Sequence, residues 1–254
     1  MTGIIRVLTW NVHGGVGLDG VRDFSRIVDH IAAIDADIVA LQEVEGRNRG
    51  DRSMPMTIIR DRLGHDGITA STISAPDGDY GQVLLSRWPL VEAATYDLSI
   101  GRLEPRRAVA ATAQTPAGDL RVIATHLGLR FGERGRQIKA LCAAFDEERP
   151  TVLMGDFNHW YRSAQTVLEQ EFAEFTKLRT YPARVPLFAL DRIFCRPAGI
   201  LVTAEVFKSE PLFSDHLPLG ATLRLPTDRA TRNLSAASVD QFRSVRWRSS
   251  STRS

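Results

Sequence analysis

An α/β fold is predicted by three features of the sequence. A strand, an amphipathic helix and a second strand follow one another over residues 4–43, an order that places neighbouring strands parallel. Residues 83–114 hold successive strands with short connections, as in an antiparallel meander. A further apolar run at residues 151–154 predicts a buried strand, which Gly155 ends just before a polar segment that begins with Asp156.

The composition fits one large domain or two small ones. The chain has 254 residues, of which 43% are hydrophobic and 24% charged, which is ordinary for a soluble globular protein. No apolar run approaches the roughly 20 residues that span a bilayer, and the first residues lack the layout of a secretory signal. Cys142 and Cys195 are too few for a disulfide framework, so we expect a cytoplasmic protein.

The charge is divided unevenly along the chain. The formal net charge is +2, but residues 226–254 carry six arginines against two aspartates, which leaves residues 1–225 slightly acidic. Composition therefore does not predict a basic nucleic-acid binder in the main body. We expect a catalytic domain over residues 1–225 and a disordered Ser/Arg-rich tail over 226–254. Three apolar residues in this tail leave open a weak contact with a membrane surface or nucleic acid.

The first strands end in polar residues. The β-branched run at 4–10 is followed by Asn11, and the apolar run at 38–42 ends in Glu43. Apolar residues with helical spacing predict a helix over about 23–34 between them. Asn11 is a metal or phosphate ligand or only a turn residue, and local sequence favours the turn. Because open α/β sheets bind ligands at the carboxyl ends of their strands, Asn11 and Glu43 together favour a cation site.

The middle of the chain is predicted to be mostly β-structure. The expected elements are a helix at 54–63, a turn at 75–79 and strands at 69–73, 83–86, 91–98 and 108–114. The loop Glu104-Pro105-Arg106-Arg107 holds two guanidinium groups. They either hold a phosphate or belong to a solvated charged loop, and the solvated loop is favoured.

His126 ends the next predicted strand, at 120–125, directly before Leu127 and Gly128. A histidine at this position can donate a hydrogen bond to a developing oxyanion, although a single histidine here is more often structural. A helix is then expected from Glu133 to about Glu148.

Asp156 and Asn158 follow the strand at 151–154. In extended backbone a spacing of two residues places both side chains on one face, where they can bind a cation, orient a water or hold a phosphate. The alternative is a turn in which these side chains bond their own backbone. Local sequence leaves the two readings about equal. A helix is expected at about 162–172.

The C-terminal third holds a second acid–histidine group. An apolar strand at 187–194 contains Asp191, whose burial is costly unless the carboxylate has a partner. Asp215 and His216 precede the last predicted strand, at 220–225, which follows another at about 200–207. Asp191 is the natural partner for His216, since a carboxylate fixes the tautomer of an imidazole and raises its basicity.

These strand-end signals closely resemble the endonuclease/exonuclease/phosphatase superfamily in their order and spacing. They are Thr-Trp-Asn11, Leu-Gln-Glu43, Thr-His126-Leu, Gly-Asp156-Phe-Asn158 and Ser-Asp215-His216, the last preceded by Leu-Asp191-Arg-Ile. Members of the superfamily include deoxyribonuclease-like and abasic-site nucleases, sphingomyelinases and inositol-polyphosphate 5-phosphatases. The resemblance covers residues 4–225. It implies a four-layer α/β sandwich in which two mixed sheets pack face to face with helices outside.

The resemblance also implies hydrolysis of a phosphoester with Mg²⁺ or Mn²⁺. Glu43 matches the main metal ligand of the family, and Asn11 and Asp215 match residues at or near the metal. His13 stands where some nucleases of the family have an acidic residue, so the metal shell is expected to be thinner or differently filled.

The remaining matches concern catalysis. Asp156 and Asn158 match residues that orient the attacking water and hold the phosphate, and His216 with Asp191 matches the catalytic His–Asp pair. His126 matches a histidine that contacts the scissile phosphate. The glutamate that orients this histidine in deoxyribonucleases has no clear counterpart, because the chain reads Asp-Tyr-Gly-Gln82 there. Either Asp156 or His216 is the base.

Three functions are open at this point. The first is a metal-dependent phosphodiesterase or phosphatase acting on a small or lipid-borne phosphoester, which the acidic main body and the likeness to small bacterial stand-alone members favour. The second is a DNA endonuclease or exonuclease, which would show a basic groove beside the site. The third is a non-catalytic phosphate-binding module. We expect a monomer in each case.

Overall fold

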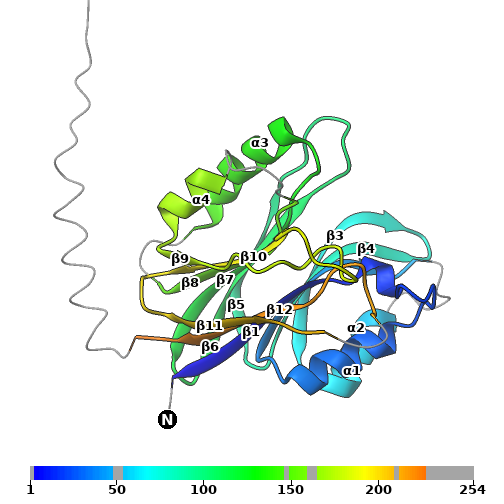
Figure 1. The fold of residues 1–254 in the computed structure, drawn as a ribbon, viewed down its shortest axis with the longest axis horizontal. Helices are drawn as coiled ribbons and strands as arrows, with labels where there is room; N and C mark the ends of the chain where they lie inside the picture. Colours follow the sequence, from blue (N-terminus) through cyan, green and yellow to red (C-terminus); the bar gives the residue numbers. More distant parts are fainter. Residues whose placement is uncertain (1–2, 48–53, 146–148, 159–164, 209–211, 227–254) are drawn as a thin grey trace, which may run out of the picture.

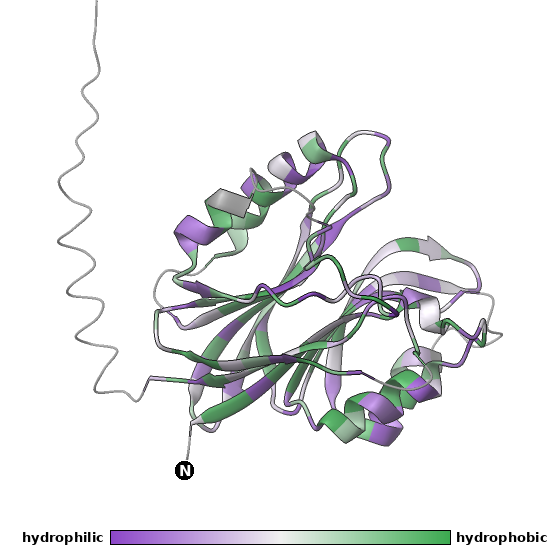
Figure 2. Ribbon diagram, viewed as in Figure 1, coloured by the Kyte–Doolittle hydropathy of each residue, from purple (hydrophilic) through white to green (hydrophobic). Residues whose placement is uncertain are grey.

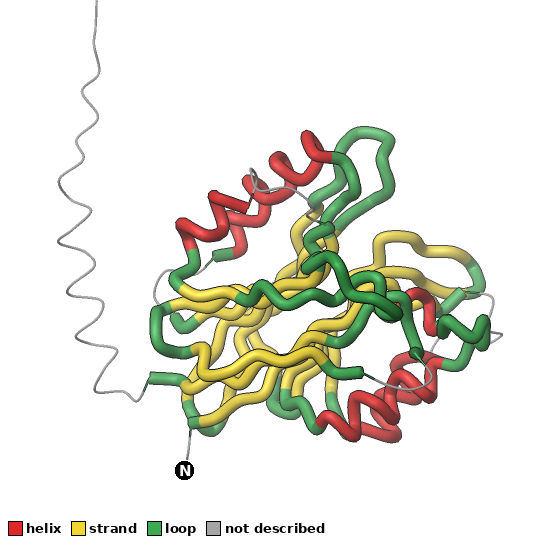
Figure 3. The backbone as a smooth tube through the Cα atoms, viewed as in Figure 1, coloured by secondary structure: helices red, strands yellow, loops and turns green. Residues whose placement is uncertain are grey.

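The computed structural model describes residues 3–47, 54–145, 149–158, 165–208 and 212–226. Two six-stranded mixed sheets lie face to face, with α-helices on their outer sides (Figures 1 and 3). The chain therefore forms the predicted four-layer α/β sandwich.

The first sheet has the strand order β11-β12-β1-β2-β4-β3, with the bounds β1 Ile4–Asn11, β2 Ile38–Glu45, β3 Asp66–Ala75, β4 Gly78–Ser86, β11 Leu201–Val206 and β12 Leu219–Arg224. The second sheet has the order β5-β6-β7-β8-β10-β9, with the bounds β5 Leu90–Asp97, β6 Arg107–Thr115, β7 Gly118–His126, β8 Thr151–Asp156, β9 Glu174–Phe175 and β10 Asp191–Arg196. Helices α1 (Phe24–Ile34) and α2 (Met54–Leu63) cover the first sheet, and α3 (Phe131–Leu141) and α4 (Gln165–Glu171) cover the second. Two 3-10 turns, η1 (His13–Gly15) and η2 (Cys142–Ala144), complete the described elements.

Each central strand is buried on both faces because it separates two hydrophobic cores. Val7 of β1 and Val122 of β7 point into the core between the sheets. Leu8 packs with α1 in the second core, and Ile123 packs with α3 in the third. This explains why these strands read as nearly continuous apolar runs. Figure 2 shows hydrophobic stretches on the strands and on the helices that pack against them.

Helix α1 forms where the helical spacing predicted it. Its N-cap residue Asp23 accepts a hydrogen bond from the backbone N–H of Ser25 at 2.9 Å, which satisfies one of the free donors at the helix start. Its apolar stripe is buried against the first sheet, and the helix ends at Ile34, with the C-cap residue Asp35 in the left-handed conformation. Sequence periodicity was sufficient here because the apolar face and both ends carry local signals.

The sheet topology gathers distant strand ends at one edge. β1 and β2 run parallel, as do β7 and β8, so each pair ends on the same side of its sheet. β10 runs antiparallel to β8 and begins there, with Asp191 opposite Asp156. β12 likewise begins beside the end of β1. Polar residues that follow or precede these strands are consequently close neighbours in space.

The expected meander over residues 83–114 is wrong in its pairing. β4 pairs with β2 and β3 in the first sheet, whereas β5 pairs with β6 in the second. The chain crosses between the sheets at Arg87-Trp88-Pro89. Pro89 has no N–H for a ladder, and the partly buried Trp88 packs against the core between the sheets. Residues 90–126 alone form the meander.

Other element boundaries also differ from expectation. The strand expected at 187–194 begins only at Asp191, because Phe188 instead pairs with Tyr181 across the proline loop. The short strand β9 was not expected. The helix expected from Glu133 to Glu148 starts at Phe131 and ends at Leu141 in a 3-10 turn. The ends of this prediction at 146–148 and of the helix prediction at 162–164, and the tail from residue 227, lie outside the described residues.

Within the described ranges, the structure contains no helix with the length and apolar character needed to cross a membrane.

Candidate active site

Asn11 links the two sheets at the end of β1. Its side-chain oxygen accepts the backbone N–H of His13 at 3.1 Å, which is the turn that local sequence favoured. Its amide nitrogen donates to Glu43 at 2.8 Å and to Asp156 at 3.1 Å. The turn and the ligand interpretations are therefore compatible: the turn fixes the amide so that it bridges a carboxylate from each sheet.

Glu43 points into the site because β2 is irregular there. The pairing of β2 with β4 shifts register between Leu41 and Val44, and Glu43 has a positive φ of 58°. This left-handed backbone is uncommon for a non-glycine residue and indicates local strain. Burial raises the pKa of Glu43 and the nearby carboxylates of Asp156 and Asp215 raise it further, against the hydrogen bond from Asn11. A cation at this position would relieve that repulsion.

Three carboxylates near Asn11 offer oxygen ligands of the kind that Mg²⁺ or Mn²⁺ prefers. Glu43, Asp156 and Asp215 come from separate elements and carry like charges close enough to interact. Among the described residues, their ion-pair partners within 4 Å are histidines, and none is a lysine or arginine. The negative charge around Glu43 and Asp215, which no lysine or arginine of the described residues pairs with, fits a divalent cation beside the amide of Asn11.

The expectation that extended backbone brings Asp156 and Asn158 together is wrong. Asn158 has a positive φ of 49°, and its backbone N–H donates to Asp156 at 2.9 Å. The expected alternative, a turn bonded to its own backbone, thus forms here as well. The turn places both side chains in the site, where Asp156 is almost fully buried.

His126 is held as a neutral imidazole. The amide nitrogen of Asn158 donates to the carbonyl of Leu127 at 3.0 Å, which fixes the orientation of that amide. The same nitrogen lies 3.2 Å from Nε2 of His126, so Nε2 accepts and the proton is on Nδ1. Burial lowers the pKa of His126 to about 3, and the positive charge of Arg106 contributes in the same direction.

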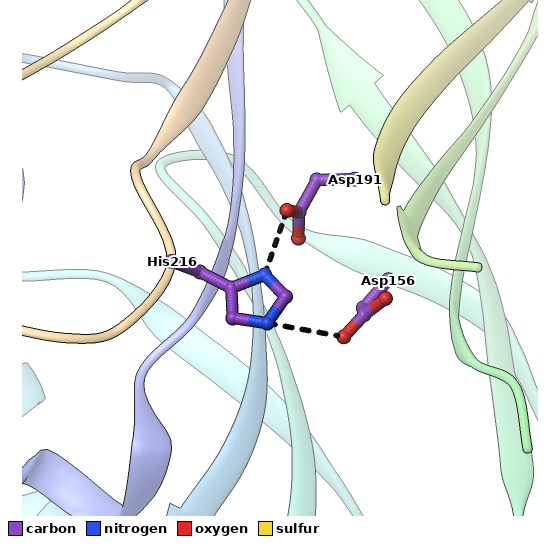
Figure 4. Close-up of side chains that lie close together, drawn as sticks. All are labelled: Asp156, Asp191 and His216. Carbon is purple, nitrogen blue, oxygen red and sulfur yellow. Dashed lines mark hydrogen bonds and ion pairs between the residues drawn. The ribbon is translucent and has the colours of Figure 1, made fainter. Parts of the chain in front are cut away.

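His216 lies between two carboxylates (Figure 4). Its Nδ1 is 2.8 Å from Oδ2 of Asp191, and its Nε2 is 3.8 Å from Oδ2 of Asp156. Burial alone would lower the pKa of His216, but the charges of Asp191 and Asp156 outweigh it and raise the pKa to about 10. At neutral pH the ring is therefore an imidazolium with its Nε2–H directed at Asp156.

Neighbouring groups fix this imidazolium in place. The indole N–H of Trp10 donates to the backbone carbonyl of His216 at 2.9 Å, and Ser214 Oγ accepts its backbone N–H at 3.2 Å. The hydroxyl of Thr180 donates to Asp191. These contacts come from both ends of the chain, so the ring position depends on the complete sandwich.

Side chains of Asp156, Asp191 and His216 also form a group with ligand atoms within 4.8 Å of one another, a spacing that a metal ion can bridge. Two observations favour proton sharing in this group. Nδ1 of His216 is already hydrogen-bonded to Asp191, and the raised pKa keeps the ring protonated, whereas a metal ligand must be a neutral imidazole.

Sequence reasoning missed a buried arginine. Arg106, expected in a solvated loop, is only 4% exposed and forms an ion pair with Glu104 at 2.9 Å. It lines a narrow cleft with Glu43, Tyr80, Gln82 and His126. Its Nε and the Oε1 of Gln82 are buried and have no hydrogen-bond partner among the described residues. The available signal was Glu104, a nearby acid that allows a guanidinium to be buried.

The neutral state of His126 predicts a pH dependence of stability. In the folded protein the pKa of His126 is about 3, below the ordinary 6.5. The stability that this neutral ring contributes is therefore fully present above pH 6.5 and is lost as the pH falls toward 3. We expect this group to add up to about 1.4 kcal/mol per pH unit to the slope of the free energy of unfolding in that window. Urea denaturation of wild type and His126→Gln at several pH values measures the difference. Equal slopes in both proteins would contradict the assignment.

Comparison with known sequences identifies relatives over most of the chain. The profile described as Endonuclease/Exonuclease/phosphatase family matches residues 8–216. The uncharacterized protein YbhP of Escherichia coli K12 is 30% identical over 243 residues, which cover 87% of this chain and 96% of YbhP. YbhP of Shigella flexneri matches with the same identity and coverage.

Solved structures share the fold. An endonuclease/exonuclease/phosphatase from Beutenbergia cavernae has a TM-score of 0.70 and 24% identity, and the match covers 87% of this chain and 72% of that one. The mannosyl-6-phosphatase Bt3783 of Bacteroides thetaiotaomicron has a TM-score of 0.65 and 17% identity over 87% of this chain and all of its own. TDP2 of D. rerio, complexed with a single-strand DNA product, has a TM-score of 0.65 and 18% identity over 87% of this chain and 99% of its own.

Proposed function

Since this chain belongs to the endonuclease/exonuclease/phosphatase family, whose members are typically hydrolases that use a divalent metal, we propose that it hydrolyses phosphoester bonds with Mg²⁺ or Mn²⁺. We propose a small or lipid-borne phosphodiester as the substrate. The observation that carries the proposal is the bridge made by Asn11, which joins Glu43 of one sheet to Asp156 of the other, beside His216. The proposed cation position and the proton-transfer group are thus linked by direct contacts.

Glu43 and Asp215 would hold the cation, with Asn11 next to it. When bound, a divalent cation neutralises charge on the phosphoryl oxygens and stabilises the leaving oxygen. The carboxylates provide hard oxygen ligands, and their mutual repulsion in the metal-free site is part of the affinity for a cation.

Asp156 is the proposed base. The imidazolium of His216 has no lone pair with which to accept a proton at neutral pH, whereas Asp156 is an acceptor fixed by Asn11 and by the N–H of Asn158. Asp156 therefore orients the attacking water and accepts its proton. His216, charged and held by Asp191, stabilises negative charge that develops on the phosphoryl group.

The phosphate itself would contact Arg106 and His126. Both line the narrow cleft beside Glu43, and the buried Nε of Arg106 has no hydrogen-bond partner in the described part of the chain. A guanidinium suits a phosphate because it offers several donors in one plane. Asn158 contributes by fixing the ring of His126 through its amide.

The slightly acidic main body favours a small or lipid-borne substrate over long DNA, since nucleic-acid binding depends on a basic surface. The fold shared with a mannosyl-6-phosphatase agrees with a small substrate. A DNA nuclease is the second candidate, because TDP2 carries a single-strand DNA product on the same fold. A non-catalytic phosphate-binding module is the third. The division into a catalytic domain over 1–225 and a tail over 226–254, the monomeric state and the cytoplasmic location stay predictions.

An activity screen tests the proposal. Purified protein with Mg²⁺ or Mn²⁺ is assayed on bis-p-nitrophenyl phosphate, p-nitrophenyl phosphate, inositol phosphates, phospholipids, nicked DNA and abasic DNA, with EDTA as the control. We expect turnover of a diester or lipid substrate that EDTA abolishes. Metal-dependent cleavage of DNA alone, weakened by salt, would favour the nuclease. Phosphate binding without turnover of any substrate would contradict the enzyme.

The role of Arg106 gives a separate prediction. Replacing Arg106 by methionine keeps the length of the side chain and removes its charge. Loss of a charged hydrogen bond to the phosphate costs about 1.5–3 kcal/mol, so we expect kcat/KM to fall by about 10–150-fold. Steady-state kinetics on the best substrate of the screen measures this. Arg107→Met is the matched control, because Arg107 is the next residue and does not line the cleft. Equal kinetics of both variants would exclude Arg106 from phosphate binding.

A further inference from the structure

We infer that His13 supplies a nitrogen ligand to the cation held by Glu43 and Asp215, and that this ligand gives the site a preference for Mn²⁺ or a similar transition metal over Mg²⁺. This inference rests on the proposed function and specifies the metal chemistry of the same site.

The ring of His13 lies between the two carboxylates. Its Nδ1 is 3.6 Å from Oδ1 of Asp215 and 3.8 Å from Oε2 of Glu43. Both distances exceed the roughly 2.7–3.2 Å of an N–H···O hydrogen bond, so these contacts are not hydrogen bonds. Ligand atoms bound to one ion at about 2.0–2.2 Å lie roughly 3–4 Å apart, which is the spacing between Nδ1 of His13 and each of these two carboxylate oxygens.

The backbone holds the ring in this position. His13 has a positive φ of 47°, which is uncommon for a residue with a side chain. The conformation is fixed by Asn11, whose side-chain oxygen accepts the N–H of His13 at 3.1 Å. Val16 closes the turn by donating its N–H to the carbonyl of His13 at 3.0 Å. Strained backbone of this kind is often found at ligand sites.

The side chain of His13 is accessible as well as correctly placed. It is 49% exposed, whereas those of Glu43 and Asp215 are 25% and 30% exposed. His13 therefore approaches both carboxylates on the side of the site that is open to solvent, where a metal can exchange. The three groups come from η1, β2 and the segment before β12, so folding alone brings them together.

An imidazole changes which metal the site prefers. Mg²⁺ is bound almost entirely through oxygen, whereas Mn²⁺ and the later transition metals also accept imidazole nitrogen. The affinity of a given site for these metals rises from Mn²⁺ to Cu²⁺. An acidic residue at position 13 would instead add a third oxygen ligand. His13→Asp should therefore move the preference toward Mg²⁺.

Pulsed electron paramagnetic resonance of bound Mn²⁺ tests the inference without any substrate. Full-length metal-free protein is loaded with one equivalent of Mn²⁺, and electron spin echo modulation is recorded for wild type, His13→Ala and His13→Asp. We expect modulation from a directly bound ¹⁴N in wild type and its loss in both variants, with Mn²⁺ still bound. Competition titrations should show the Mg²⁺/Mn²⁺ affinity ratio rising by at least about tenfold in His13→Asp.

Other outcomes separate the possible failures. A ¹⁴N signal that persists in His13→Ala and is lost in His216→Asn would place the metal in the Asp156–Asp191–His216 group and overturn the inference. Mn²⁺ bound to wild type through Glu43 without any ¹⁴N signal would also overturn it, while leaving the proposed metal-dependent function intact. Absence of Mn²⁺ and Mg²⁺ binding to wild type would contradict both proposals.

Discussion

Alanine at position 216 is expected to lower kcat for phosphodiester hydrolysis by about 10²–10⁴-fold. His216 is the charged group that faces Asp156, and its imidazolium is maintained by Asp191 at 2.8 Å. Without the ring, negative charge that develops on the phosphoryl group loses its fixed partner. Steady-state kinetics measures the change, and circular dichroism shows whether the fold is retained.

The buried carboxylate of Asp191 requires a second variant. Asp191 is fully buried, and removing His216 leaves its charge without the imidazolium, which is destabilising. The double variant His216→Ala/Asp191→Asn removes both charges. If the two residues act as one unit, the double variant should have about the kcat of His216→Ala and a higher melting temperature. Activity of His216→Ala near the wild-type level would refute the assignment.

Glutamine at position 43 is expected to abolish most metal-dependent turnover, with a loss of roughly 10³-fold, because a metal contributes several kcal/mol of charge stabilisation at the phosphoryl group. Glutamine has the same shape as glutamate, and its side-chain oxygen can still accept the hydrogen bond from Asn11. The variant therefore removes the negative charge without removing the contact.

Stability provides an independent measure of the same change. The raised pKa of Glu43 means that its charge disfavours the metal-free fold at neutral pH. We therefore expect Glu43→Gln without metal to melt at or above the wild-type temperature. With excess Mn²⁺, wild type should gain stability by linkage and the variant should gain little.

Glu45→Gln is the matched control for position 43. Glu45 lies two residues further along β2 and pairs with Arg47 at 2.7 Å rather than with the site. Its substitution should leave both turnover and the stabilisation by Mn²⁺ near wild type. Equal stabilisation of wild type and Glu43→Gln by Mn²⁺ would show that the metal binds elsewhere.

Local signals explain which parts of the fold the sequence predicts. Strand runs and the stripe of α1 are visible because each position reports its own burial through side-chain type. Pairing between strands depends on contacts that are distant in sequence, and the expected meander failed for this reason at Pro89. Asp191 was expected inside a strand because its apolar neighbours look continuous, although Phe188 pairs with a different segment.

The site shows a similar division. Strand ends carrying Asn11, Glu43 and Asp156 could be placed together from topology and family resemblance. The positive φ of Glu43 and the double use of Asn11 as turn and bridge depend on tertiary packing. Arg106 was assigned to solvent because charged residues are usually exposed, and its burial follows from its ion pair with Glu104.

Anomalous X-ray diffraction from crystals grown with Mn²⁺ and inorganic phosphate tests the central claim most directly, namely that one pocket holds a cation and a phosphate between the sheets. We expect a manganese peak in contact with Glu43 and Asp215, with the phosphate between it and His216. A peak within the Asp156–Asp191–His216 group, or none near Glu43 at saturating Mn²⁺, would contradict the claim.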